Sequence, residues 1–375
     1  MTERLRRFAD SRALETPCLL IDLDRIEANY LALTEALPEA AVYYAVKANP
    51  DPQVLTRLAM LGSAFDVASV PEVEMALATG VAPEKLSYGN TIKKEADIAA
   101  AFAKGVDLFA FDSAAELAKI GRAAPGARVF CRILTSGDGA EWPLSRKFGC
   151  TPGMARELLA QAQDHGLRAF GVSFHVGSQQ RDPTQWDTAL AEVASLFADL
   201  DQIGIELEMV NLGGGFPTTY LEDVPPAAAY GLAIAASIRR HFGNRLPRLI
   251  MEPGRGLVGD AGVILTEVVL IARKGGTDDR RWVYLDIGKF GGLAETMDEA
   301  IRYPIECDRH GPAEPVILAG PTCDSADVLY ERTPYALPLG LEIGDRLRLA
   351  STGAYTSTYA SVSFNGFAPL QTHCV

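Results

Sequence analysis

The sequence predicts an α/β protein in two parts: a closed (β/α)8 barrel over residues 23–256 and a mainly β domain formed by residues 1–22 and 257–375. Two observations predict the barrel. Short β-branched and aromatic runs alternate with Ala-, Leu- and Glu-rich stretches of helical period, and about eight such runs occur, which is the number a barrel needs. A third observation predicts the second domain, because long β-branched runs punctuated by Gly and Pro begin after Gly256.

The barrel strands can be placed one by one. We expect them at Val42–Val46, Ala64–Ala68, Leu86–Tyr88, Leu108–Phe111, Arg128–Ile133, Ala169–Phe174, Leu207–Asn211 and Arg248–Met251. Helical patterns lie between them, among them Pro52–Leu61, Val70–Ala78, Lys93–Lys104, Met154–His165 and Trp186–Leu200. A closed barrel is the economical interpretation, but a doubly wound open sheet shows the same alternation and remains the alternative.

The second domain has its own strand pattern. We expect strands at Val263–Ile271, Trp282–Ile287, Val316–Leu318 and Arg346–Leu349. The run Cys18–Ile21 is also strand-like and precedes the first barrel helix, so we expect it to pair with this domain. Residues 1–17 mix arginines with acidic residues and contain no apolar segment, which favours a short surface helix over a targeting peptide.

Composition excludes several classes of function. The chain has 375 residues and a formal charge of −13, from 35 Lys and Arg against 48 Asp and Glu. This acidic balance repels phosphate backbones and anionic lipid, so we expect neither a nucleic-acid partner nor a membrane partner. The six cysteines form no C-x-x-C pair, which argues against a zinc ribbon or a disulfide-stapled secreted domain and favours the reduced cytoplasm. No metal is expected, because no His, Asp and Glu cluster has metal-ligand spacing.

Residues that can carry chemistry stand at the ends of the expected barrel strands, where barrel enzymes place their reactive groups. In chain order they are Lys47, Asp66, Arg132, His175, the glycines Gly213–Gly215, and Glu252. Lys47 directly follows an apolar strand, so it can form a Schiff base with a carbonyl cofactor or a buried structural ion pair. The glycines let backbone N–H groups approach a phosphate, or simply make a tight turn. Glu252 can keep a heteroaromatic nitrogen protonated, or pair with Arg255.

Other motifs are weaker. The run Gly254–Gly259 matches G-x-G-x-x-G, but the strand-like Ala261–Ile271 follows it instead of a helix, so the dinucleotide interpretation fails. Taken alone, His175 is typical of a core histidine, and the Cys323–Asp324 pair is typical of an inert thiol in a turn. Together, however, the lysine, the glycines, the strand-end carboxylate and the aromatic base meet the requirements of pyridoxal phosphate.

Seven segments resemble the ornithine decarboxylases of the fold-type III, alanine-racemase-like pyridoxal phosphate enzymes. In the same order over nearly the whole chain, they are Tyr44–Asn49, Ser173–Ser178, Gly213–Pro217, Glu252–Arg255, Gly320–Asp324, Gly353–Thr356 and Phe364–Phe367. In that family the lysine matching Lys47 carries the cofactor, the glutamate matching Glu252 keeps the pyridine nitrogen protonated, and the histidine matching His175 stacks on the ring.

The resemblance also implies roles for the remaining site residues. It assigns the phosphate to Ser178, Gly214, Gly215, Gly254, Arg255 and Tyr355, and it puts Asp66 and Arg132 near the lysine. Cys323 would return a proton to the α-carbon and Asp324 would bind the distal amine of the substrate. In the family these two come from the partner subunit, which implies a homodimer with shared active sites. Further substrate contacts would be Asp298, Tyr355 and Phe364.

The implied activity is pyridoxal-phosphate-dependent decarboxylation of L-ornithine to putrescine and CO₂, a step of polyamine biosynthesis, with L-lysine to cadaverine as a second activity. One methylene separates the two substrates, which a pocket discriminates by only about 1 to 3 kcal/mol. Three alternatives remain. A diaminopimelate decarboxylase shares the fold but differs around Cys323–Ser325, and an alanine racemase sets an arginine against the ring nitrogen. A non-catalytic homologue that binds a regulatory protein is expected to lack residues such as Lys47 and Glu252.

Overall fold

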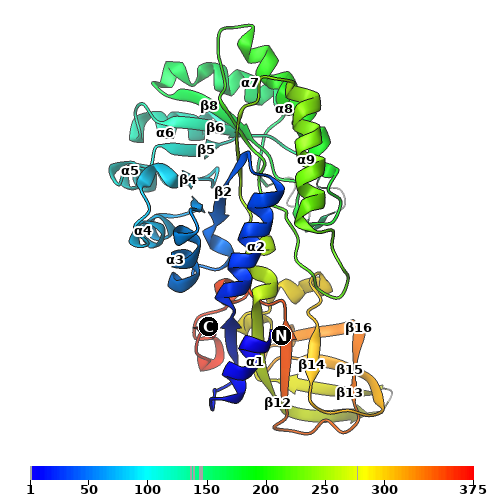
Figure 1. Ribbon diagram of the computed structural model, residues 1–375. Coiled ribbons are helices and arrows are strands. Elements are labelled where there is room, and N and C mark those ends of the chain that lie inside the picture. The colour runs from blue at the N-terminus through cyan, green and yellow to red at the C-terminus, as the bar shows by residue number, and fades with distance from the viewer. Residues whose placement is uncertain (1, 136, 138–139, 143–146, 277) are drawn as a thin grey trace. The chain divides into compact units, whose positions relative to one another are not determined.

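A computed structural model describes residues 2–135, 137, 140–142, 147–276 and 278–375 (Figure 1). The chain divides into two compact units. The barrel unit consists of Glu27–Pro217 and Val224–Gly256, and the β unit consists of Met1–Ile26, Thr218–Asp223 and Leu257–Val375. The β unit is therefore assembled from three separate stretches of the chain.

Parallel strands close the barrel unit into a ring. In order around the ring they are β10 (Met209–Asn211), β11 (Arg248–Met251), β2 (Ala40–Ala45), β3 (Ala64–Val67), β4 (Leu86–Tyr88), β5 (Leu108–Phe111), β6 (Arg128–Arg132) and β8 (Arg168–Ser173). Strand β10 pairs with both β11 and β8, which completes the closure. The predicted (β/α)8 barrel is thus confirmed, and the open-sheet alternative is excluded.

Side chains of alternating residues fill the inside of the ring, as this architecture requires. They form one buried cluster that consists of Tyr43, Ala64, Leu108, Ala110, Phe130, Phe170, Met209 and Ile250. The barrel strands are largely buried on both faces, as parallel strands covered by helices are. Because they are parallel, their carboxyl ends lie at the same side of the ring. The polar residues that follow the strands therefore meet at one rim.

Helices connect the barrel strands. They are α2 (Leu23–Ala36), α3 (Pro52–Met60), α4 (Val70–Ala78), α5 (Glu95–Ala103), α6 (Ala114–Ala123), α7 (Pro152–Gln161), α8 (Gln185–Asp201) and α9 (Ala227–Phe242). Local sequence sets several of their starts. Ser69 caps α4 by accepting from the N–H of Glu72, whose side chain in turn accepts from the N–H of Ala68. Across the described ranges, every helix is too short or too polar to cross a membrane.

Helix α5 starts two residues later than its sequence pattern predicts. Lys93 was expected inside the helix, but its ammonium donates to the backbone oxygens of Asn90 and Ala110 and pairs with the buried carboxylate of Glu116. These bonds hold Lys93 in the loop after β4. Tertiary contacts therefore override the local helical preference at this position.

The β unit contains the mainly β domain that the sequence predicts. Its mixed sheet runs β14 (Ile305–Cys307), β17 (Arg346–Ala350), β12 (Gly262–Gly275), β13 (Asp278–Leu285), β15 (Ala313–Ala319) and β16 (Val328–Pro338), and β1 (Cys18–Ile21) and β18 (Gln371–Cys374) join it beside β12. Strand β1 pairs antiparallel with β12, which confirms the pairing expected for Cys18–Ile21. Helix α1 (Glu3–Asp10) is the expected short N-terminal helix, and it buries Leu5 against β1 and β12.

Three strands of the β unit were not predicted. Strands β14 and β18 are only three and four residues long. Strand β16 was missed because its middle, Glu331–Pro334, is exposed and polar and reads as a loop. Its pairing with β15 is interrupted there, since Val316 faces Tyr335 whereas Leu318 faces Tyr330.

Candidate active site

Lys47 and Asp66 form an ion pair at the ends of two neighbouring barrel strands. Strand β2 ends at Ala45, and the single 3₁₀ turn Val46–Ala48 carries Lys47 out of the ring. Its Nζ lies 3.0 Å from Oδ2 of Asp66 in β3, and the lysine side chain is half exposed whereas Asp66 is buried. The pairing orients the lysine amine while leaving it accessible, which is what attachment to a carbonyl group needs.

One oxygen of Asp66 accepts no hydrogen bond within the part of the chain that the structure describes. Among the described residues, none hydrogen-bonds to the buried Oδ1 of Asp66. Gly89, just after β4, leaves room for this oxygen, because a Cβ at that position would collide with it. Leaving a buried carboxylate oxygen without a hydrogen bond costs free energy. This oxygen therefore favours the binding of a hydrogen-bond donor that does not belong to the barrel.

The glycine run after β10 packs against the ends of two other strands. Gly213 has a φ of +67°, and a Cβ on it would collide with the backbone oxygen of Phe174. A Cβ on Gly214 would approach the backbone oxygen of Glu252 to 2.8 Å and Nε2 of His175 to 3.1 Å. Side chains are therefore excluded from this turn, so its backbone can come close both to the neighbouring strands and to a ligand.

Glu252 follows β11 and is held by Asn211, the last residue of β10. The Nδ2 of Asn211 donates to Oε1 of Glu252 at 2.5 Å, while Oδ1 of Asn211 accepts from the N–H of Gly213 at 2.9 Å. Burial, with a smaller contribution from the charge of Asp66, raises the pKa of Glu252 to about 7, although Lys47 and Arg132 oppose the rise. Such a carboxylate is well suited to share a proton with a weakly basic ring nitrogen.

His175 is a neutral imidazole with a fixed orientation. Its Nδ1 accepts from the backbone N–H of Gly177 at 3.0 Å. Burial, together with the positive charges of Arg132 and Lys47, holds the pKa of His175 well below its ordinary value. A neutral, oriented ring beside the glycine run offers a flat apolar face to another aromatic ring.

Three further predicted residues lie at the same rim. Arg132 ends β6; burial lowers its pKa, while the carboxylates of Glu252, Asp112 and Asp66 oppose the change. Nε of Arg255 donates to Oγ of Ser178 at 3.3 Å, so the structure brings these two predicted phosphate ligands together. After Gly254, a one-turn helix (α10, Arg255–Val258) and a 3₁₀ turn lead directly into β12. The run is thus not the start of a dinucleotide-binding helix, as expected.

The other predicted site residues belong to the β unit. Cys323 is exposed, its N–H donates to Oδ1 of Asn365 at 3.1 Å, and its Sγ accepts from Nδ2 of Asn365 at 3.3 Å. These bonds bring the Gly320–Asp324 and Phe364–Phe367 segments together. Asp324 accepts from the N–H of Ala326, and Tyr355 has a φ of +55°. The Asp298 side chain is 79% exposed and lies 3.1 Å from the guanidinium of Arg332.

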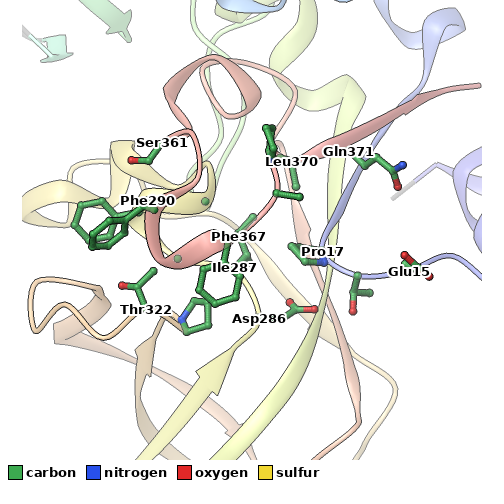
Figure 2. Close-up of a pocket in the computed structure, with 17 residues that line it drawn as sticks. Glu15, Pro17, Asp286, Ile287, Phe290, Thr322, Ser361, Phe367, Leu370 and Gln371 are labelled. Carbon is green, nitrogen blue, oxygen red and sulfur yellow. The ribbon is translucent and has the colours of Figure 1, made fainter.

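A cavity of about 400 Å³ adjoins these segments within the β unit. It extends from Phe290 on one side to Gln371 and Glu15 on the other, with Phe367 and Ile287 between them (Figure 2). Phe364 also lines it, and its ring lies 4.9 Å from that of Phe290. Phe290 was not predicted as a site residue, because one aromatic residue in a glycine-rich turn carries no motif.

The residues that orient the reactive groups were not predicted from the sequence. Asn211, Gly89 and Gly177 set the positions of Glu252, Asp66 and His175 through the contacts described above. A signal existed for Asn211, since an asparagine two residues before a glycine commonly makes such a turn. The other two are glycines whose role depends on residues distant in the sequence.

The rim fits the pyridoxal phosphate expected from the sequence. Lys47 provides an accessible amine, and Asp66 has an oxygen to which no described residue donates. Glu252 provides a carboxylate near neutrality for the ring nitrogen, and His175 a neutral ring. The side-chain-free turn with Ser178 and Arg255 provides donors for a phosphate.

Comparisons with known proteins agree with this fit. Residues 23–259 match the family model "Pyridoxal-dependent decarboxylase, pyridoxal binding domain". The chain is 37% identical over 362 residues to the lysine/ornithine decarboxylase of Selenomonas ruminantium, covering 95% of this chain and 89% of that protein. It is 34% identical over 368 residues to antizyme inhibitor 2 of Xenopus laevis, covering 94% and 79%. A crystal structure of lysine/ornithine decarboxylase from Vibrio vulnificus complexed with cadaverine is 32% identical, with a TM-score of 0.89 over 100% of this chain and 98% of that chain.

Proposed function

Since the chain belongs to the pyridoxal-dependent decarboxylases of the ornithine and lysine group, we propose that it converts L-ornithine to putrescine and CO₂, with L-lysine as a second substrate. Use of pyridoxal phosphate and decarboxylation of a basic amino acid follow from membership of the family. The observation that carries catalysis is the pairing of Lys47 with Asp66 beside a Glu252 that Asn211 holds.

Each residue of the rim has a task in this reaction. When bound, pyridoxal phosphate supplies an electron-withdrawing ring that accepts the electron pair left on the α-carbon as CO₂ departs. The amine of Lys47, which Asp66 orients, would hold the cofactor covalently. Glu252 uses Oε1 to accept from Asn211, so Oε2 is the oxygen that we assign to hold the proton of the ring nitrogen. The neutral ring of His175 would stack on the cofactor ring and exclude water from that face.

The later steps are assigned to residues of the β unit. Cys323 delivers a proton to the α-carbon after CO₂ has left, and Nδ2 of Asn365 stabilises the sulfur that loses it. Asp324 and Asp298 bind the distal ammonium through charge-assisted hydrogen bonds. By family resemblance Cys323 and Asp324 act in the site of the partner subunit, so we propose an obligate homodimer. The exposed thiol and the aromatic cavity beside it are compatible with a surface that a second chain covers.

Ornithine is preferred in this proposal, and lysine is the second substrate. Two carboxylates suit a substrate with a distal ammonium, and one additional methylene changes binding by only about 1 to 3 kcal/mol. The relative from Selenomonas ruminantium is named for both substrates, and the Vibrio vulnificus structure contains cadaverine. All six cysteines are free thiols, which supports action in a reducing compartment such as the cytoplasm.

The second candidate is a non-catalytic binding protein. Its support is the 34% identity with antizyme inhibitor 2, which is nearly as high as the identity with the decarboxylase. We favour the enzyme because Lys47, Asp66, Glu252 and His175 are all present and mutually oriented. A protein that only binds a partner has no need to keep Glu252 at a costly near-neutral pKa.

One assay decides between these functions. The protein loaded with pyridoxal phosphate is incubated separately with ornithine, lysine, arginine and diaminopimelate, and the amine products are quantified. We expect putrescine to form fastest and cadaverine next. The Lys47→Ala variant is the control for contaminating activity. No CO₂ or amine from any substrate, with the cofactor attached, would favour the binding protein, and diaminopimelate as the best substrate would favour the other decarboxylase.

A further inference from the structure

The segment that contains Asp298 adopts a backbone conformation that residues other than glycine normally avoid. Within Ala294–Glu299 the helical turn breaks at Met297, and Asp298 and Glu299 then follow with φ values of +54° and +59°. Two consecutive non-glycine residues in the left-handed region are unfavourable, because each Cβ approaches a backbone carbonyl. Such strain persists only where surrounding contacts enforce it, and it clusters at functional sites.

The carboxylate of Glu299 provides those contacts. Its Oε1 accepts from the N–H groups of Glu331 and Arg332 at 2.8 and 2.6 Å, and its Oε2 accepts from the N–H of Thr333 at 3.0 Å. These three residues lie where β16 loses its pairing with β15, between Tyr330 and Tyr335. At this β-bulge in β16, Glu299 therefore accepts the hydrogen bonds that the neighbouring strand does not accept. The same bonds connect the strained turn to β16.

The bulge in β16 also places a positive charge, that of Arg332, beside Asp298. Arg332, whose N–H Glu299 accepts, extends its guanidinium so that Nη2 lies 3.1 Å from Oδ1 of Asp298. Both side chains of this pair are largely exposed, at 71% and 79%. Glu299 thus fixes the position of its chain neighbour Asp298, and it fixes the backbone of Arg332 by accepting from its N–H. A pair this exposed is weak, so another cation can displace it.

This arrangement bears on substrate recognition. We propose that Glu299 is a positioning residue that holds Asp298 in place for the distal ammonium of the substrate, and that Arg332 is a resident cation which this ammonium displaces. The inference rests on the proposed function, in which Asp298 binds that ammonium. Glu299 itself does not touch substrate.

The charge of Glu299 is compatible with this role. Although burial disfavours ionisation, hydrogen bonds from the backbone N–H groups of Glu331, Arg332 and Thr333 leave its pKa below the ordinary value. Glu299 therefore stays ionised under conditions in which the enzyme works. A glutamine in its place retains one acceptor oxygen, so it keeps the bonds to Glu331 and Arg332 and loses the bond to Thr333.

Steady-state kinetics of four variants test the proposal in the loaded enzyme. Glu299→Gln should raise KM for ornithine about threefold and Glu299→Ala about tenfold or more, each with kcat nearly unchanged. Arg332→Gln should act in the opposite direction and lower KM about two- to fivefold, because a competing cation is removed. The absorbance of the bound cofactor should stay as in the unsubstituted enzyme, since the substituted residues do not contact it.

The fourth variant, Asp298→Asn, separates the premise from the inference. If Asp298→Asn leaves KM for ornithine unchanged, the assignment of Asp298 in the proposed function fails, and the inference fails with it. If Asp298→Asn raises KM but Glu299→Gln and Arg332→Gln do not change it, the inference alone is overturned.

A double substitution distinguishes positioning from a merely structural role. In the Asp298→Asn background, Glu299→Gln should add little to KM, because both changes remove the same interaction. Independent, multiplicative effects on KM would overturn the proposal. The matched control is Asp345→Asn, which weakens another backbone-capping carboxylate of the β unit, one that accepts from the N–H of Glu342 at 2.7 Å. This control should leave KM and the preference for ornithine over lysine unchanged.

Discussion

Replacing Glu252 by glutamine should stabilise the cofactor-free protein while disabling the loaded enzyme. The amide is nearly the same size as the carboxyl group, and its oxygen can still accept from Asn211, so packing is conserved. What changes is the charge. Above pH 7, the partly buried carboxylate of the unsubstituted protein carries a negative charge that forms no ion pair with the described residues, whereas the amide is neutral.

The size of this effect follows from the pKa of Glu252. Burial raises it from 4.5 to about 7, and a tenfold change in proton affinity corresponds to 1.36 kcal/mol. Because the folded protein binds this proton more tightly than the unfolded chain, the stabilising contribution is complete below about pH 4.5 and is lost as the pH rises through 7. The loss reaches about 3 kcal/mol at pH 8, an upper value because the side chain is not fully shielded from water.

Urea unfolding of the cofactor-free protein at pH 5 and pH 8 measures this contribution. Glu252→Gln should be more stable than the unsubstituted protein at pH 8 by up to about 3 kcal/mol, and the difference should fall below about 1 kcal/mol at pH 5. Glu208→Gln, an exposed barrel carboxylate paired with Arg168, is the control and should show no such trend. An equal difference at both pH values would refute the assignment of a near-neutral pKa to Glu252.

Activity of the loaded variant gives the second half of the prediction. Since an amide cannot keep the ring nitrogen protonated, turnover of ornithine should fall on the order of 10²-fold or more, with cofactor binding largely retained. An unchanged turnover number would contradict the role of Glu252 even if the stability data agreed.

Three further predictions concern the remaining site residues. Lys47→Ala should abolish turnover, and borohydride reduction followed by peptide mapping should find the cofactor on Lys47; a label on another lysine would displace this assignment. Mixing Lys47→Ala subunits with Cys323→Ala subunits should restore activity to about a quarter of the sites, because random exchange builds one intact site in each heterodimer. No recovery after verified exchange would indicate sites built from one chain. Asp298→Ala should weaken use of ornithine strongly while the absorbance of the bound cofactor stays normal, and Asp298→Glu should disfavour lysine more than ornithine, because the pocket becomes about one methylene shorter. An unchanged kcat/KM for ornithine in Asp298→Ala would move the amine anchor to another acid of the segment.

The barrel was predictable in detail because its signals are local. All eight expected strands occur with ends within two residues of those predicted, since each is an apolar run bounded by Gly, Pro or a helix cap. The family resemblance read from seven segments is confirmed by the comparisons. What the sequence could not reveal depends on contacts between distant residues. Lys93 leaves its helix for the carboxylate of Glu116, and the bulge in β16 is stabilised by Glu299, some 30 residues earlier.

The same distinction between local signals and contacts of distant residues applies to the site residues. Lys47, Glu252 and the glycine run could be found because each directly follows an apolar strand, and strand ends of a barrel share one rim. Asn211, Gly89 and Gly177 could not be found in this way, because their role is to shape or hold another side chain. The near-neutral pKa of Glu252 likewise depends on burial, which a motif does not encode.

The position of strand β1 in the sequence determines when the sheet of the β unit can assemble during synthesis. Leu20 pairs with Val263 on one side and with His373 on the other, so its neighbours emerge from the ribosome roughly 240 and 350 residues later. At about 5 to 20 residues per second, the apolar run Cys18–Ile21 waits tens of seconds for its first partner, while consecutive barrel strands meet their neighbours far sooner. The apolar segment Cys18–Ile21 of the nascent chain therefore stays without its strand partners throughout translation of the barrel. A chain truncated before Gln371 keeps one edge of that strand open, and such an edge is a template for aggregation.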